Sequence, residues 1–302
     1  MTPTIITTLL LPIAVGVIMF GLGLALAPSD FARVVRYPRA VVVGLLIQTV
    51  VMVPVAFCLT QWFALPAGLA IGLMLLAAAP GGPTATIFSH LAEGDVALNV
   101  TLTAINSVVA MAWLPLVLTW SLEHFLGAGQ YVPPPTQKLV EVATVIVFPV
   151  FIGMVVRALA PRFAQSAVRP VRVGSVLVLA GLVAIAFVGY REVVVQQFGA
   201  VGLACLVFNL ISMTVGYVVP RAVRLPPPQA TAIALEIGIH NAALAIFVAL
   251  TVLQDPVAPV PAAVYSLVMF ATAGGATLWL RRRHLAGLAD SRRIIATSQD
   301  TR

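Results

Sequence analysis

Apolar stretches of about twenty residues recur along this 302-residue chain, and they constrain its fold more than any other feature. An α-helix rises 1.5 Å per residue, so roughly twenty residues cross the hydrocarbon core of a bilayer. Backbone groups in lipid must pair within their own segment, which favours helices. A β-barrel would instead show alternating apolar and polar residues in pieces of about ten, and this sequence lacks that pattern. We therefore predict an all-α integral membrane protein.

The composition, and the residues that separate the apolar stretches, support this prediction. Only 9% of the residues are charged, whereas a soluble domain carries roughly a quarter. Clusters of proline, glycine and aspartate, such as Pro133–Pro135 and Pro226–Pro228, divide the apolar stretches. We expect about nine transmembrane helices, at roughly 4–27, 40–62, 67–92, 96–125, 137–159, 173–190, 196–219, 229–252 and 257–280. Cys58 and Cys205 lie inside apolar stretches, and we interpret both as core residues.

Positive charge is distributed unevenly between the two sides of this topology. Fifteen of the seventeen Arg and Lys residues fall on one side, and only Lys138 and Arg191 fall on the other. Cytoplasmic loops accumulate Arg and Lys, so the rich side is cytoplasmic. The N-terminus is then outside and the C-terminus inside, which requires an odd number of spans. The same bias explains the net charge of +7, and we expect no nucleic-acid partner.

Two of the predicted helices are interrupted in the middle. The third contains Pro80–Pro83 (PGGP), and the eighth contains Glu236–Asn241 (EIGIHN). Each is third in a block of four helices, and the two blocks enter the membrane from opposite sides. Transporters with inverted repeats place broken helices at matching positions in this way. The first break is either a kink that helps packing, or a gap that frees carbonyls for a cation and aims the N–H groups from Thr84 onward at an anion.

Glu236 is the strongest candidate for a functional residue. A carboxylate at the bilayer centre is unfavourable by about 2.5–3.5 kcal/mol on insertion scales, so function usually explains its presence. The alternative is a protonated side chain bonded to a neighbouring helix. His240 lies one helical turn further along on the same face, and it is either part of the functional site or a core residue.

A polar stripe in the fourth predicted helix accompanies this carboxylate. Asn99, Thr103 and Asn106 occur at positions i, i+4 and i+7, and Gln48 adds a further amide in the second helix. Such stripes either hold helices together or supply the neutral oxygens that a hard cation prefers. The sequence shows no nucleophile–base pair, phosphate-binding loop or transition-metal spacing, so we do not expect an enzyme.

Three stretches of the sequence resemble the bile acid:sodium symporter family. They are 21–31 (GLGLALAPSDF), 79–98 with its APGGPT and GDVAL motifs, and Glu236–Asn241. They occur in family order, and the likeness covers nearly the whole chain. The resemblance implies a core domain, in which two broken helices cross, and a panel domain. Bacterial members often have ten helices, and we expect this chain to have nine, without the first of the ten.

The domain organisation that follows is a single transmembrane transporter domain over residues 1–285. Its core helices would lie at about 40–125 and 196–280, and its panel helices at about 4–27, 137–159 and 173–190. Residues 286–302 would form a polar, basic cytoplasmic tail.

The resemblance also implies two sodium sites and a substrate site. The first sodium site would use Thr86, Asn99, Thr103 and Glu236, with Ala85 standing where a serine is usual. The second would use Gln48, Glu236, the carbonyls of Ile237 and Ile239, and His240, which stands where a glutamine is usual. The substrate carboxylate would lie at Pro83, Thr84 and Asn241, where the two half-helices begin and present their positive ends. The resemblance adds Phe270, which stands where an asparagine commonly lines the substrate cavity.

The sequence thus predicts sodium-coupled symport of an organic anion, with one or two Na⁺ ions. Bile acids, pantoate-like hydroxy acids and oxo acids all fit the family as substrates. We expect a multi-pass protein of the plasma or cell inner membrane, acting as a monomer in the lipid bilayer. One alternative is a proton-coupled organic anion transporter that uses Glu236 and His240. Another is a channel or a structural membrane protein.

The charge bias predicts a cytoplasmic C-terminus. A fluorescent protein that folds only in the cytoplasm should fluoresce when it is fused after Arg302. Alkaline phosphatase, which needs an oxidising compartment, should be inactive at the same position. The reverse pair of signals would overturn the nine-helix topology.

Overall fold

The structure of the protein is a computed structural model that describes residues 11–26, 32–82, 84–127, 136–189, 191–253, 255 and 257–279. Secondary structure in these residues is helical apart from one isolated β-bridge. The helices are α2 (Leu11–Ala25), α4 (Pro38–Leu46), α5 (Met52–Trp62), α6 (Ala67–Ala78), α7 (Ala85–Leu91), α8 (Val96–Leu126), α9 (Thr136–Leu159), α10 (Pro161–Gly189), α11 (Arg191–Ala222), α12 (Pro227–Gly238) and α13 (Ala242–Val248). A further helix covers Val260–Trp279, and we call it helix 260–279.

Short irregular turns complete this list. The 3-10 turn η2 covers Arg33–Val35, and the π-helical turns η3 and η4 cover Ile47–Val51 and Ala249–Leu253. Helices α4 and α5 continue through η3 as one span, Pro38–Trp62.

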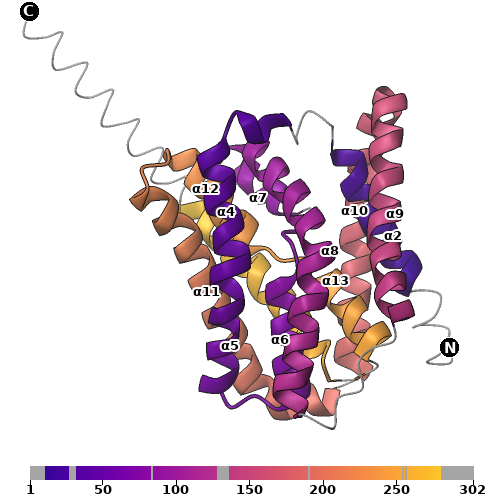
Figure 1. Ribbon diagram of the computed structural model, residues 1–302, viewed down its shortest axis with the longest axis vertical. Helices are drawn as coiled ribbons and strands as arrows, with labels where there is room; N and C mark the ends of the chain where they lie inside the picture. The colour runs from indigo at the N-terminus through magenta and orange to yellow at the C-terminus, as the bar shows by residue number, and fades with distance from the viewer. Residues whose placement is uncertain are drawn as a thin grey trace, which may run out of the picture.

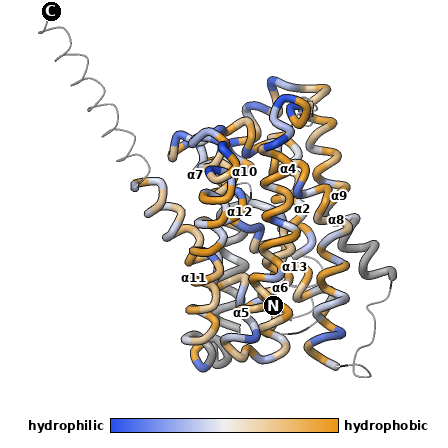
Figure 2. The backbone as a smooth tube through the Cα atoms, turned by 60° about the vertical axis from the view of Figure 1, so that its left-hand side comes forward, coloured by the Kyte–Doolittle hydropathy of each residue, from blue (hydrophilic) through white to orange (hydrophobic). Residues whose placement is uncertain are grey.

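Four helices of the described chain are long and apolar enough to cross a membrane. They are Pro38–Trp62, Val96–Leu126, Gly199–Ala222 and Val260–Trp279. Shorter apolar helices cover Val15–Ala25, Ala67–Ala78 and Val147–Leu159. Hydrophobic residues follow the lengths of the helices, and most hydrophilic segments lie near their ends (Figure 2). The prediction of an all-helical membrane protein is confirmed, whereas the number of nine spans stays a prediction.

Two details of the sequence-based interpretation are wrong. Helix α10 begins at Pro161 rather than near residue 173, because a proline is tolerated in the first turn of a helix and Pro170 is accommodated inside it. Cys58 is exposed on α5, so only Cys205 is a core residue. The apolar stretch around Cys58 fits a lipid-facing surface equally well.

Both predicted interruptions are present, and they meet. The third predicted helix divides into α6 and α7, and the eighth divides into α12 and α13. The backbone N–H groups of Gly82 and Asn241 donate to the carbonyls of Ile239 and Pro80, at 2.8 and 2.9 Å. The two breaks therefore pair with each other as a single antiparallel bridge.

Helices α6, α12 and α13 lie largely in the interior of the molecule, whereas α7 is partly exposed. All residues from Ala230 to Gly238 are buried, as are those from Leu69 to Ala78. By contrast, the long spans expose large apolar side chains, such as Leu116 at 62% and Leu203 at 51%. The breaks are buried because lipid cannot form hydrogen bonds with exposed backbone groups. Irregular backbone is therefore tolerated at membrane depth only where protein or water surrounds it.

Helices α2, α9 and α10 form a separate group beside the broken helices (Figure 1). Gly23 of α2 and Gly153 of α9 allow a close approach of these two helices. A Cβ on Gly153 would lie only 2.5–2.8 Å from backbone atoms of Phe20, Gly23 and Leu24. Backbone cannot move aside as a flexible side chain can, so glycine is required here.

We predict that Gly153→Leu separates α2 from α9 and lowers the stability of the purified protein. Overpacking of this kind reduces the free energy of unfolding by about 1–3 kcal/mol. Gly181→Leu on α10 is the matched control, because a Cβ there meets nothing within 4 Å. Thermal unfolding in detergent measures both variants. Equal midpoints for the two would show that the glycine contact is not needed.

Candidate cation and substrate site

Glu236 occupies the last turn of α12, beside the break, and its side chain is completely buried. The Thr103 hydroxyl donates to its Oε2 at 2.6 Å, and the Asn106 amide donates to its Oε1 at 3.4 Å. Gly81 lies against the carboxylate on the other side, where any Cβ would overlap it. The carboxylate is thus held by neutral donors from α8 and by the bare backbone of the first break.

The residues predicted for a first sodium site are brought together by α7, α8 and α12. Thr86 Oγ1 donates to Asn99 Oδ1 at 2.9 Å, and Asn99 Nδ2 donates to the carbonyl of Ala232 at 3.0 Å. Thr103 Oγ1 lies 3.0 Å from the Asn99 carbonyl, in addition to its bond with Glu236. The polar stripe of α8 therefore faces the broken helices and connects to both of them.

Gln48 and His240, predicted for a second site, converge on one carbonyl. Gln48 Nε2 donates to the carbonyls of Ala77 and Ala79, both at 3.2 Å. His240 Nδ1 lies 3.1 Å from the same Ala79 carbonyl, so this ring nitrogen carries the proton. Gln48 Oε1 and His240 Nε2 are buried acceptors without a hydrogen-bond partner within the described chain. Unpaired buried acceptors are destabilising, which makes both atoms candidates to bind a cation or a proton.

The two predicted backbone ligands are Ile237 and Ile239, which are fully buried beside the break. The Ile239 carbonyl accepts the N–H of Gly82. A carbonyl oxygen has two lone pairs, so this bond leaves one for a cation. Among the described residues, no group of three or more His, Cys, Asp or Glu side chains could hold a metal ion. Neutral oxygens and one carboxylate are the available ligands.

The predicted substrate residues lie around the starts of α7 and α13. Thr84 and Asn241 are buried at the N-caps of α7 and α13, and Asn241 Oδ1 accepts the N–H of Leu244 at 3.1 Å. Asn241 Nδ2 is buried without a partner in the described part of the chain. Phe270 of helix 260–279 stacks on Phe88 of α7, with ring centroids 6.2 Å apart. The remaining substrate prediction, Pro83, lies outside the described residues.

Three functional candidates were missed or undervalued by sequence reasoning. Asn209 and Tyr265 were not among the predicted site residues, yet both bind the carbonyl of Gly238 at the second break. Asn106 was placed in the polar stripe but not among the ligands, although it contacts Glu236 and its Oδ1 is buried and unpaired. The available signal was the rule that a buried Tyr hydroxyl or amide inside an apolar span must find a partner.

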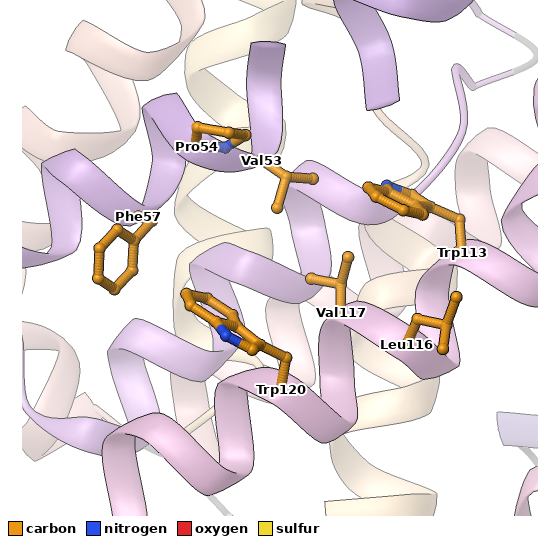
Figure 3. A pocket seen from close by; sticks show the side chains of 7 residues that line it. All are labelled: Val53, Pro54, Phe57, Trp113, Leu116, Val117 and Trp120. Carbon is orange, nitrogen blue, oxygen red and sulfur yellow. The ribbon is translucent and has the colours of Figure 1, made fainter. Parts of the chain in front are cut away.

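An apolar cavity of about 410 Å³ lies apart from these polar residues, between α5 and α8. Figure 3 shows Phe57 from α5 and Trp113 and Trp120 from α8 around it, and the rings of Phe57 and Trp120 are in edge-to-face contact at 5.1 Å. The lining residues are Val53, Pro54, Phe57, Trp113, Leu116, Val117 and Trp120. None of the described residues that line this cavity is charged, and none belongs to the candidate ion site.

Comparison with known proteins identifies the family of the chain. Residues 12–197 match the Sodium Bile acid symporter family. The chain belongs to this family. It is therefore a membrane transporter of a sodium-coupled family and not an enzyme, as the sequence predicted. Membership also disfavours the alternative of a channel or a structural protein.

The similar relatives span bacteria, plants and animals. The chain is 30% identical to an uncharacterized sodium-dependent transporter of Bacillus subtilis (strain 168), over 84% of this chain and 78% of the relative. It is 28% identical to a probable chloroplastic sodium/metabolite cotransporter of Oryza sativa subsp. japonica, over 93% of this chain and 67% of the relative. It is 25% identical to the ileal sodium/bile acid cotransporter of Homo sapiens, over 80% of this chain and 69% of the relative.

The bond between Thr103 and Glu236 generates a prediction. Thr103→Val removes the closer of the two side-chain donors from a buried carboxylate, so the free energy of unfolding should fall by about 1.5–3 kcal/mol. The isosteric control is Thr101→Val, because the buried Thr101 hydroxyl donates to Ala97 within α8. Thermal unfolding should separate the two variants. If the control is as unstable as Thr103→Val, the loss of stability does not come from the contact with Glu236.

Proposed function

We propose that this protein is a secondary active transporter that couples import of an organic anion to sodium. The observation that carries this proposal is the fully buried Glu236, held at a helix break by neutral side chains. An ionised carboxylate in such a place needs a compensating cation, and the groups bonded to it supply none. The relatives that are named sodium-dependent transporters support sodium as that cation.

The first sodium site consists of Thr86, Asn99, Thr103 and Glu236. These residues offer hydroxyl, amide and carboxylate oxygens, which are the ligands that hard cations prefer. Their present hydrogen bonds show that the side chains already reach one another. Asn106 adds a further amide oxygen, and it offsets the oxygen that is lost where Ala85 replaces the usual serine.

The second site consists of Gln48, Glu236, the carbonyls of Ile237 and Ile239, and His240. Gln48 Oε1 and one lone pair of the Ile239 carbonyl are free to bind an ion. Imidazole nitrogen is a softer ligand than an amide oxygen, so His240 makes this site weaker for sodium. We therefore propose that one sodium ion is coupled rather than two.

The substrate binds beside this ion site, near Pro83, Thr84, Asn241 and Phe270. The unpaired Asn241 Nδ2 is a buried donor for a carboxylate, and the starts of α7 and α13 direct N–H groups to the same region. Phe270 and Phe88 add an apolar surface for the body of the substrate. Bile acids, pantoate-like hydroxy acids and oxo acids are the classes to screen.

The transport cycle is a rocking motion between two domains. The core comprises the helices at about 40–125 and 196–280, and the panel comprises those at about 4–27, 137–159 and 173–190. The separate grouping of α2, α9 and α10 supports this division (Figure 1). Nine helices in an inverted repeat, with the N-terminus outside and residues 286–302 in the cytoplasm, complete the proposed topology.

A proton-coupled transporter is the second candidate function. The buried, unpaired Nε2 of His240 favours it, because this atom can accept a proton without first breaking a hydrogen bond. Uptake into proteoliposomes distinguishes the two functions. Sodium coupling requires a sodium gradient at constant pH, whereas proton coupling requires an inward proton gradient in the absence of sodium.

We predict that Glu236→Gln abolishes sodium-driven uptake while the protein still folds, because it removes the fixed charge shared by both ion sites. A thermal-shift screen of organic acids, with and without sodium, first identifies a substrate, since ligands stabilise the form that they bind. Glu123→Gln is the control, because Glu123 is exposed near the end of α8. Normal sodium-driven uptake by Glu236→Gln would refute the site assignment.

Charge movement tests the number of sodium ions. One sodium ion with one monoanion carries no net charge, so an inside-negative potential should not stimulate uptake by the wild-type protein. His240→Gln restores an amide oxygen at the second site and should make uptake electrogenic. A potential of 100 mV then contributes about 2.3 kcal/mol, or roughly fifty-fold in accumulation. Strong stimulation of the wild-type protein in proteoliposomes would show that His240 does not weaken the second site.

A further inference from the structure

The carbonyl of Gly238, the last residue of α12, accepts two hydrogen bonds from other helices. Asn209 Nδ2 of α11 donates to it at 2.8 Å, and the Tyr265 hydroxyl of helix 260–279 donates to it at 2.9 Å. Both side chains are completely buried. The break in α12 removes the helical partner of this carbonyl, so the side chains take the place of an amide that the helix would have supplied.

These donors form a closed network. The second N–H of the Asn209 amide donates to the Tyr265 hydroxyl at 3.0 Å, and Asn209 Oδ1 accepts the Thr272 hydroxyl at 2.6 Å. Both amide protons and the phenolic proton are therefore used. The Thr272 bond also fixes which end of the Asn209 amide faces Gly238, because only the oxygen end can accept it.

The same helices also hold the ring of His240, two residues after Gly238. Phe208 stacks on this ring with centroids 5.5 Å apart at an angle of 23°, and Tyr265 meets it edge to face at 5.5 Å and 67°. The Ala79 carbonyl fixes the rotation of the ring, because it accepts a hydrogen bond from His240 Nδ1. Phe208 and Asn209 are consecutive in α11, so one turn of that helix contacts both the peptide and the ring.

We propose that Asn209 and Tyr265 are positioning residues that set the geometry of the cation ligands at the second break. They bind the carbonyl of Gly238, which lies between the proposed ligands Ile237 and Ile239, and Tyr265 also contacts the ring of His240. This inference rests on the proposed sodium coupling. It assigns a role in ion affinity and ion selectivity to α11 and helix 260–279, neither of which contributes an ion ligand to the proposed sites.

A fixed peptide matters because ligand geometry distinguishes ions of equal charge. Sodium and lithium differ mainly in the distance at which oxygens surround them, so a rigid set of oxygens discriminates better than a loose one. Loss of positioning should therefore reduce sodium affinity and narrow the preference for sodium over lithium. A purely structural role would lower stability equally with every ion.

The test uses sodium alone as the probe, so it needs no known substrate. The purified full-length protein is unfolded thermally at increasing NaCl, with choline chloride keeping the ionic strength constant, and the series is repeated with LiCl. Tyr265→Phe and Thr272→Val are the informative variants, and Thr272→Ser should restore wild-type behaviour. Ser266→Ala is the control, because Ser266 is buried next to Tyr265 but donates to Ala263 in its own helix.

The expected result for Tyr265→Phe is an approximately fivefold higher half-saturating sodium concentration, as follows from one hydrogen bond of about 1 kcal/mol. The ratio of lithium to sodium half-saturation should fall as well, and Ser266→Ala should change neither value. Variants that only lower the midpoint, with unchanged ion affinities, overturn the positioning role and leave the proposed function standing. A wild-type protein that sodium does not stabilise overturns the proposed function itself, and this inference with it.

Discussion

The structure depends on how two interrupted helices satisfy their backbone polar groups inside a membrane protein. Hydrocarbon offers no hydrogen bonds, so the N–H and C=O groups freed by a break must find protein partners. Here each break supplies partners for the other, through the pairs Gly82–Ile239 and Asn241–Pro80. Side chains from outside the pair complete the requirement, because Gln48 binds Ala79 and Asn209 binds Gly238. The burial of α6, α12 and α13 follows from the same requirement.

The pairing of the two breaks brings a buried carboxylate and several unpaired polar atoms into one region of the structure. The pairing brings the bare backbone of Gly81 against the Glu236 carboxylate, where a larger residue could not fit. The same region contains buried atoms without partners, including Gln48 Oε1, Asn106 Oδ1 and His240 Nε2. Buried polar groups are normally paired, so these unpaired acceptors around the two breaks support the proposal that a positively charged ligand binds there. Binding a cation would satisfy groups that folding leaves unsatisfied.

The sequence predicted the parts of this arrangement that depend on rare residues in apolar surroundings. Pro80 and its neighbouring glycines identified one break, and Glu236 identified the other, because both are incompatible with an ordinary membrane helix. The spacing of Asn99, Thr103 and Asn106 correctly placed them on one face of α8. A periodic pattern does not say which helices will pack together, so it could not show that Asn209 and Tyr265 contact Gly238. It also could not separate a lipid-facing residue from a core residue, and Cys58 was assigned wrongly for that reason.

The pairing of the breaks also suggests why ion and substrate sites adjoin in the proposed transporter. Asn241 caps α13 through its side chain and binds the first break through its backbone, while the preceding His240 binds Ala79. A cation that draws the Ile239 carbonyl or the Gln48 amide towards itself would compete with these same bonds. Any such shift would move the start of α13, and with it the donor that we assign to the substrate. Coupling between the two ligands then requires no long pathway, because three consecutive residues, Ile239 to Asn241, contribute to both sites.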